Sequence, residues 1–194
     1  MRTVILASES PRRKDLLASL DIPFKTVPSN IDEESIEEKD PHKLVLTLAR
    51  LKAEKIAPDY PEAVIVAGDT VVYFEGNIMG KPKDIDDARR MLTMLRGTVN
   101  MIVTGCVVMD SKTKKHAEIS SESKVFMKHY SDDLLERYIA SGHPLDKAGA
   151  YGYLGVGVAM VDHVVGSYFD GIGLPLGFVI EQLESFGVEV LGKK

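Results

Sequence analysis

The sequence predicts an α/β protein in which helices flank a mixed β-sheet. Short apolar runs typical of buried strands alternate with segments of helical periodicity early in the chain. Two longer strand-like runs, 101–109 and 118–127, lie on either side of Asp110-Ser111-Lys112-Thr113, which is typical of a hairpin. Alternation favours parallel pairing and the hairpin adds antiparallel pairing, so we expect a mixed sheet. The 194 residues predict one domain over 1–194, with two small lobes as the alternative.

Each expected helix has a recognisable start. Ser and Asp are good N-caps, and Pro suits the first helical position. The helices are expected to begin at Ser10-Pro11, at Pro41, at Asp84 (ending near Gly97), at Ser131 (reaching Ala140) and at Pro175.

The expected strands are short apolar runs bounded by polar or turn residues. Residues 28–40 are polar and acidic and are expected to form a loop, and Glu75-Gly76-Asn77 is expected to form a tight turn. Besides the hairpin, the strands are expected at 3–7, 24–27, 63–67, 71–74, 156–165 and 188–191.

Composition excludes several classes of function. The net charge of −5 argues against general duplex binding, so no nucleic-acid partner is expected. No stretch approaches the ~18 apolar residues of a membrane span, and the first apolar run is too short for a signal peptide. We therefore expect a cytoplasmic protein with no membrane partner. The single cysteine, Cys106, lies in an apolar run and is expected to be a buried packing thiol.

The first candidate site is Ser8-Glu9-Ser10-Pro11-Arg12-Arg13, between a predicted strand and a predicted helix. Unpaired N–H groups and the helix dipole favour an anion at a helix start. Arg12 and Arg13 add forked donors suited to phosphate, and the hydroxyls of Ser8 and Ser10 add hydrogen bonds. The alternative is an ordinary capped helix with exposed arginines.

The second candidate is a set of carboxylates, Asp32-Glu33-Glu34 and Asp69. Asp69 is expected at the exit of a core strand, where α/β proteins bind ligands. Magnesium takes carboxylate oxygens together with substrate phosphate oxygens and waters. The alternatives are a solvated acidic loop for the first group and turn capping for Asp69.

Two lysines form the third candidate. Lys52 lies beside the apolar stripe of the second helix, and Lys81 lies between Gly80 and Pro82. Each could place a point charge on a triphosphate, and the alternative is a lysine that snorkels to solvent. The chain contains no Walker A, G-x-G-x-x-G or G-x-S-x-G pattern, and its five histidines lack zinc-ligand spacing.

Taken together, the segments resemble the Maf family of nucleotide pyrophosphatases. The resemblance runs in order along nearly the whole chain. It is carried by Ser8-Glu9-Ser10-Pro11-Arg12-Arg13, Leu16-Leu17, Asp32-Glu33, Leu48-Ala49-Arg50-Leu51-Lys52-Ala53, Ala67-Gly68-Asp69-Thr70-Val71-Val72, Gly80-Lys81-Pro82, Val103-Thr104-Gly105, Asp146-Lys147-Ala148-Gly149-Ala150-Tyr151-Gly152, Gly166-Ser167-Tyr168 and Gly173-Leu174-Pro175-Leu176.

The resemblance implies an elongated mixed-sheet fold like that of inosine-triphosphate pyrophosphatases, and a homodimer. It implies hydrolysis of a nucleoside triphosphate between its α and β phosphates, to NMP and pyrophosphate, with Mg or Mn. The residues that it assigns are Ser8, Ser10, Arg12, Arg13 and Lys147 for substrate binding, Glu33 and Asp69 for metal binding or water activation, and Lys52 and Lys81 for catalysis by charge neutralisation.

The segment from Asp146 to Gly152 resembles the branch that accepts dTTP and UTP, because the branch favouring 7-methyl-GTP usually has Cys where Lys147 stands. Leu154 stands where the pyrimidine branch usually has Gln, and Asn100 stands where the family often has His. Two alternatives remain open: a pyrophosphatase for modified purine triphosphates such as 7-methyl-GTP or ITP, and a non-catalytic nucleotide-binding regulator of septum formation.

Overall fold

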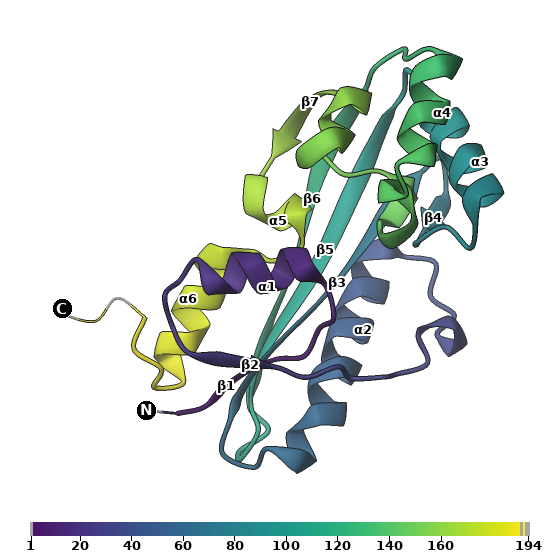
Figure 1. Cartoon of the computed structure of the whole chain (residues 1–194). Helices are drawn as coiled ribbons and strands as arrows, with labels where there is room; N and C mark the ends of the chain where they lie inside the picture. The colour runs from purple at the N-terminus through teal and green to yellow at the C-terminus, as the bar shows by residue number, and fades with distance from the viewer. Residues whose placement is uncertain (1, 191, 193–194) are drawn as a thin grey trace. The chain divides into compact units, whose positions relative to one another are not determined.

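The computed structural model describes residues 2–190 and 192 and contains a mixed sheet flanked by helices, as predicted (Figure 1). The strand order is β2-β1-β3-β5-β6-β7, and β4 pairs with β3 off this path. Strand β1 is parallel to β2 and to β3, whereas the β3–β4 and β6–β7 pairs are antiparallel. The strands are β1 (Val4–Leu6), β2 (Phe24–Thr26), β3 (Val64–Phe74), β4 (Asn77–Met79), β5 (Val99–Asp110), β6 (His116–Met127) and β7 (Val161–Gly166).

The helices begin close to the predicted start signals. Ser10, Asp40, Asp84 and Ser131 all accept hydrogen bonds from the first helical turn that follows them. The α-helices are α1 (Pro11–Ala18), α2 (Pro41–Ile56), α3 (Ile85–Leu95), α4 (Asp132–Ala140), α5 (Tyr168–Ile172) and α6 (Leu176–Ser185), and the 3₁₀ segments are η1 (Glu33–Ser35), η2 (Ala57–Asp59), η3 (His143–Asp146), η4 (Ala148–Ala150) and η5 (Gly155–Met160).

The chain divides into two compact units. The first contains the residues up to Asp69, Thr104–Ser121 and the residues from Gly173 onward; the second contains Thr70–Val103 and Glu122–Ile172. Strands β3, β5 and β6 each contribute residues to both units. Within the described residues, no helix is long and apolar enough to cross a membrane.

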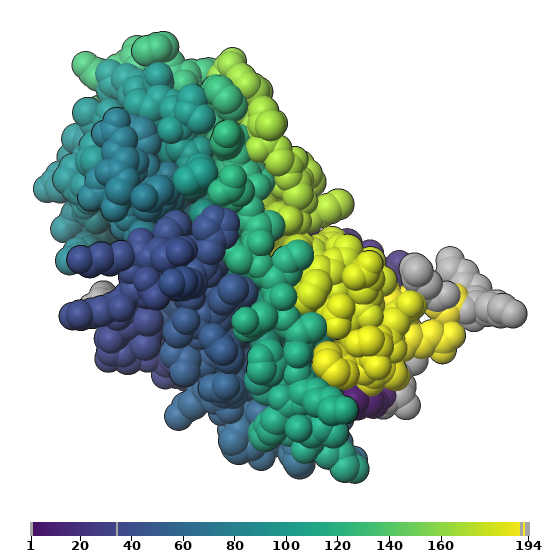
Figure 2. Space-filling model, turned by 180° about the vertical axis from the view of Figure 1, so that it is seen from behind, coloured from purple at the N-terminus to yellow at the C-terminus, as the bar shows by residue number. Residues whose placement is uncertain are grey.

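The core of the first unit packs α2 against strands β1, β3 and β5. Small side chains dominate the contact, with Ala49 and Ala53 of the helix facing Ala67 of β3 in one buried cluster. Small residues let a helix backbone approach a sheet closely. On the surface of this unit, α6 and the turn between β5 and β6 are both visible in Figure 2.

The side chains in the core of the second unit are larger than those in the core of the first. Residues of α3 and α4 pack against β5, β6 and the segment that contains Tyr151, in a cluster that includes Leu92, Leu95, Tyr138 and Met160. The Tyr151 hydroxyl donates a hydrogen bond to Asn100 Oδ1 at 2.7 Å inside this core. Asn100 therefore supplies an acceptor that Tyr151 needs because the ring is buried.

The structure corrects several sequence-based expectations. The predicted strands 63–67 and 71–74 form one continuous strand, β3, because Gly68-Asp69-Thr70 keeps the extended conformation. Residues 155–160 form η5, so only the end of the predicted 156–165 strand is real. Val156 and Val158 are 53% and 55% exposed, which a buried strand would not allow. Residues 188–190 are not a strand, and Leu191 lies outside the described residues.

An ion pair near the start of the chain links three segments of the first unit. The Arg2 guanidinium donates to both carboxylate oxygens of Asp110 at 3.0 Å and to the Phe186 carbonyl at 2.9 Å. The hydrogen bonds from Arg2 hold the pKa of the Asp110 carboxyl at about 2, below its usual range.

We predict that Asp110→Asn lowers the free energy of unfolding at pH 6 by roughly 1–2 kcal/mol. Because the folded-state pKa of Asp110 is depressed, its contribution is complete above the unfolded-state pKa of about 4 and is lost as pH falls toward 2. Denaturant unfolding at a series of pH values should therefore show the difference between parent and variant shrinking below pH 4. Asp15→Asn, on the exposed face of α1, is the control, and a pH-independent difference for Asp110→Asn would contradict the assignment.

Candidate functional site

The segment between β1 and α1 forms a ring of polar contacts at the helix start. Ser8 is buried directly after β1, and its Oγ accepts hydrogen bonds from the Ser10 backbone N–H at 3.2 Å and from an Arg13 terminal nitrogen at 3.3 Å. Ser10 caps α1 by accepting from the Arg13 backbone N–H. The structure therefore brings Ser8, Ser10 and Arg13 together at one helix start, and their shared role in phosphate binding stays a prediction.

The Arg13 side chain is half-buried and turns back over its own helix start. Its Nε donates to the Gly173 carbonyl at 2.9 Å, in addition to the bond to Ser8. Burial lowers the pKa of the guanidinium from its ordinary value, the Asp69 carboxylate raises it, and the neighbouring charge of Arg12 lowers it. Two arginine charges therefore lie at the start of α1, and one of them is within electrostatic reach of Asp69.

A second constellation joins the carboxylates through one ammonium. Lys52 Nζ donates to Asp69 Oδ1 at 2.6 Å and lies 2.8 Å from Glu33 Oε1. The side chains of Lys52 and Asp69 are 8% and 9% exposed, whereas that of Glu33 is 52% exposed. The three residues come from α2, β3 and η1, so segments distant in sequence meet at Lys52.

Close backbone packing positions Lys52. At Gly105 of β5, an added Cβ would lie only 2.6 Å from the backbone carbonyl group of Val45 in α2. Any other residue at 105 would push α2 away from the sheet. Gly105 therefore sets the distance between α2, which carries Lys52, and β5, which lies next to β3 in the sheet.

The position of Asp69 differs from the sequence prediction. We expected it at the exit of a strand, but it lies inside the eleven-residue β3, where its side chain is buried. Burial raises the pKa of the Asp69 carboxyl, and the charges of Lys52 and Arg13 oppose that rise. A buried carboxyl with a raised pKa, held by a lysine, is a common feature of functional sites.

Glu33 and Asp69 have the donor chemistry that a divalent cation requires. Their oxygens converge on one positive group, Lys52 Nζ, so a cation could bridge the same two carboxylates. Within residues 2–190 and 192, no group of three or more His, Cys, Asp or Glu side chains is arranged to hold a metal ion. Two carboxylates fit Mg²⁺, which usually takes one or two of them and completes its shell with phosphate oxygens and water.

The remaining predicted lysines, Lys81 and Lys147, belong to the second unit. Lys81 is exposed in the loop after β4. Lys147 donates to the His143 carbonyl at 2.6 Å and forms an ion pair with Asp146. The two loops are joined, because the Gly149 N–H donates to the Gly80 carbonyl at 3.0 Å.

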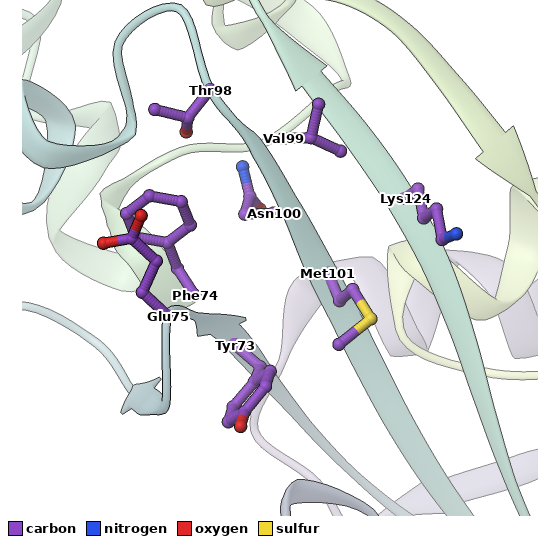
Figure 3. A pocket seen from close by; sticks show the side chains of 8 residues that line it. All are labelled: Tyr73, Phe74, Glu75, Thr98, Val99, Asn100, Met101 and Lys124. Atoms are coloured by element: carbon purple, nitrogen blue, oxygen red, sulfur yellow. The ribbon is translucent and has the colours of Figure 1, made fainter.

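A pocket of about 500 Å³ in the second unit contains none of the predicted site residues (Figure 3). It is lined by parts of β3, β5 and β6, including Tyr73, Met101 and Lys124. Asn100 lines the pocket as well, but its side-chain oxygen is bonded to Tyr151. The predicted site residues Glu33, Lys52 and Asp69 lie in the first unit and do not line this pocket.

The Gly173 carbonyl is a functional group that the sequence reasoning missed. The Gly173-Leu174-Pro175 motif contributes to the family resemblance, but its sequence does not predict a role for the Gly173 carbonyl. Its φ of 132° is a conformation that other residues rarely adopt, and this conformation presents the carbonyl to Arg13.

We predict that Lys52→Met destabilises the metal-free protein more at pH 8 than at pH 5. The substitution removes the charge that opposes the burial effect, so the folded-state pKa of Asp69 rises further. A raised folded-state pKa means that stability is retained at low pH and lost as pH rises. Thermal unfolding should show the larger deficit at pH 8, whereas Lys55→Met, an exposed lysine of the same helix, should show little at either pH. Equal deficits at both pH values would contradict this account.

The sequence of this chain matches known proteins along nearly its whole length. The family described as Maf-like protein matches residues 3–186. A dTTP/UTP pyrophosphatase from Dictyoglomus thermophilum is 43% identical over 98% of this chain and 99% of its own length. A dTTP/UTP pyrophosphatase from Pyrococcus furiosus is 41% identical over 95% of each chain. A solved structure of a HAM1 protein from Coxiella burnetii is 16% identical, with a TM-score of 0.46 over 67% of this chain and 75% of its own. With a family match over nearly its whole length, this chain belongs to the Maf family.

Proposed function

We propose that this protein is a nucleoside-triphosphate pyrophosphatase that hydrolyses dTTP and UTP to the monophosphate and pyrophosphate. The observation that carries the proposal is the meeting of Glu33 and Asp69 at one buried lysine, in the same unit as the arginine-bearing start of α1. Full-length relatives at about 40% identity that bear the name dTTP/UTP pyrophosphatase support the choice of reaction and base.

The start of α1 would bind the phosphate chain. A triphosphate carries about four negative charges, and phosphoryl transfer depends on positioning and neutralising them. Arg12 and Arg13 supply charge, and the Ser8–Ser10 segment supplies hydroxyls and helix N–H groups. The bonds from Arg13 to Gly173 and Ser8 fix the guanidinium plane before substrate arrives, which reduces the ordering cost of binding.

The carboxylates would orient the attacking water at the α-phosphorus. Asp69 is held rigidly by Lys52 and by its burial in β3, whereas Glu33 is half-exposed and can reorient. Glu33 and Asp69 would also hold Mg²⁺ or Mn²⁺, which supplies charge neutralisation and polarises the phosphate oxygens. Either carboxylate can accept the proton of the water, and the raised pKa of Asp69 favours it as a base.

Lys52 has two roles in this scheme. Without ligand it neutralises the two carboxylates, and with a nucleotide bound its ammonium is available to the phosphate chain. The substrate contacts predicted for Lys81 and Lys147 in the second unit stay predictions. So do a homodimeric state and a cytoplasmic location, which sedimentation and cell fractionation would test.

One observation favours the alternative in which the substrate is a modified purine triphosphate. Leu154 is 40% exposed and occupies the position where the pyrimidine branch usually has Gln. A leucine has no hydrogen-bonding group with which to read a base edge. A panel of nucleotides that includes 7-methyl-GTP and ITP therefore belongs in the first assay.

We predict that the purified protein releases pyrophosphate from dTTP and UTP in the presence of Mg²⁺ or Mn²⁺. Asp69→Asn keeps the shape and removes the buried charge, so kcat should fall by roughly 10²-fold or more. Asp59→Asn, an exposed aspartate of η2, is the matched control and should retain activity. Products should be separated by ion-exchange chromatography, so that NMP plus pyrophosphate is distinguished from NDP plus phosphate.

Other outcomes reassign the function in defined ways. Pyrophosphate release from purine triphosphates alone would support the proposed reaction and show that the preferred base is a purine. Nucleotide binding without turnover would favour the regulator, and unchanged kcat in Asp69→Asn would remove Asp69 from the chemistry.

A further inference from the structure

We propose that Gly68 is a positioning residue: the absence of a side chain there allows the Arg13 guanidinium to stay bonded to the Gly173 carbonyl beside Asp69. This inference rests on the proposed function, in which Arg13 binds the phosphate chain. Gly68 directly precedes Asp69 in β3, and all of the groups involved belong to the first unit.

The requirement at residue 68 is one of space. A Cβ built on Gly68 would lie 3.3 Å from Arg13 Nε and 3.3 Å from the Gly173 carbonyl oxygen, which are the two ends of the 2.9 Å hydrogen bond. It would also lie 3.2 Å from the Gly105 carbonyl oxygen. Because two of these neighbours are backbone atoms of packed segments, the flexible Arg13 side chain is the group that would move.

The backbone conformation at residue 68 does not require a glycine. Gly68 lies inside a strand and is absent from the residues with positive φ, so alanine can adopt its backbone angles. Gly76 is the opposite case: it has a φ of 82° and no atom within 4 Å of a built Cβ. The effect of a substitution at 68 should therefore pass through the neighbours of the missing methyl group.

The position of Arg13 matters because of what surrounds it. Its Nε bond to Gly173 and its terminal-nitrogen bond to Ser8 hold the guanidinium in one plane, within the field of Asp69. A Cβ at residue 68 would require the guanidinium to give by a few tenths of an ångström, which disturbs the match of a forked donor to phosphate oxygens. A misplacement of about 1 Å can lower a rate by up to ~10²-fold, so this smaller shift should lower it by less. The glycine thus links the strand that carries the carboxylate to the side chain that binds phosphate.

A double-mutant cycle tests this link. Gly68→Ala should raise KM for dTTP or lower kcat/KM by roughly 3- to 10-fold. In an Arg13→Ala background the same change should have little further effect, because the side chain that it displaces is gone. Gly177→Ala, in α6 of the same unit with no atom near its built Cβ, is the control and should be active. Independent, multiplicative losses in the double variant, or a fully active Gly68→Ala, would overturn the proposal.

A second readout does not depend on activity. In the parent protein, the Arg13 Nε–H should give a resolved ¹H–¹⁵N resonance that is protected from solvent exchange, and Gly68→Ala should abolish the protection. If the parent hydrolyses no nucleotide, the proposed function fails while this measurement still tests the positioning. If Gly68→Ala alone does not fold, Arg13→Ala should restore folding, and failure of the double variant to fold would assign the glycine to backbone packing instead.

Discussion

The bond between Lys52 and Asp69 is the interaction on which the rest of the site depends. An isolated carboxylate inside a β-strand would lose ionisation to burial, and an isolated buried ammonium would do the same. At 2.6 Å the Lys52 ammonium opposes the rise that burial causes in the pKa of Asp69, and Glu33 adds a second, more exposed acceptor. The pair therefore keeps an ionisable carboxylate in a core strand, where its backbone is rigid and its side chain cannot drift.

Glycine and alanine residues allow close packing at specific positions in the first unit. Gly105 brings the α2 backbone against β5, and alanines of α2 pack on the strand that carries Asp69. Gly68 leaves room for Arg13, whose partner is a carbonyl at Gly173. Because these positions carry small side chains or none, the backbones approach closely, and this packing sets the geometry of the polar cluster.

The helices were predictable because their signals are local. Capping side chains at Ser10, Asp40, Asp84 and Ser131 act within one turn, and the apolar stripes repeat at helical spacing. The prediction of a strand over residues 156–160 is wrong because alternating valine and glycine imitate strand periodicity, while Gly155 turns the backbone with a φ of 61°. The sequence analysis assigned Lys52 to the phosphate chain and did not predict its pairing with both carboxylates. Which atoms meet depends on the distance of the helix from the sheet and on strand register, which no local pattern encodes. The place of Asp69 within β3 was missed for the same reason.

The central claim is that the carboxylates held by Lys52 direct water at the α-phosphorus, and isotope transfer tests it most directly. The protein should hydrolyse dTTP in H₂¹⁸O with Mg²⁺ present, and the products should be analysed by mass spectrometry. Our account predicts one ¹⁸O atom in dTMP and none in pyrophosphate. Label in the pyrophosphate would place the attack on the β-phosphorus, and label in released orthophosphate with dTDP as the partner product would place it on the γ-phosphorus. Either result would contradict the account.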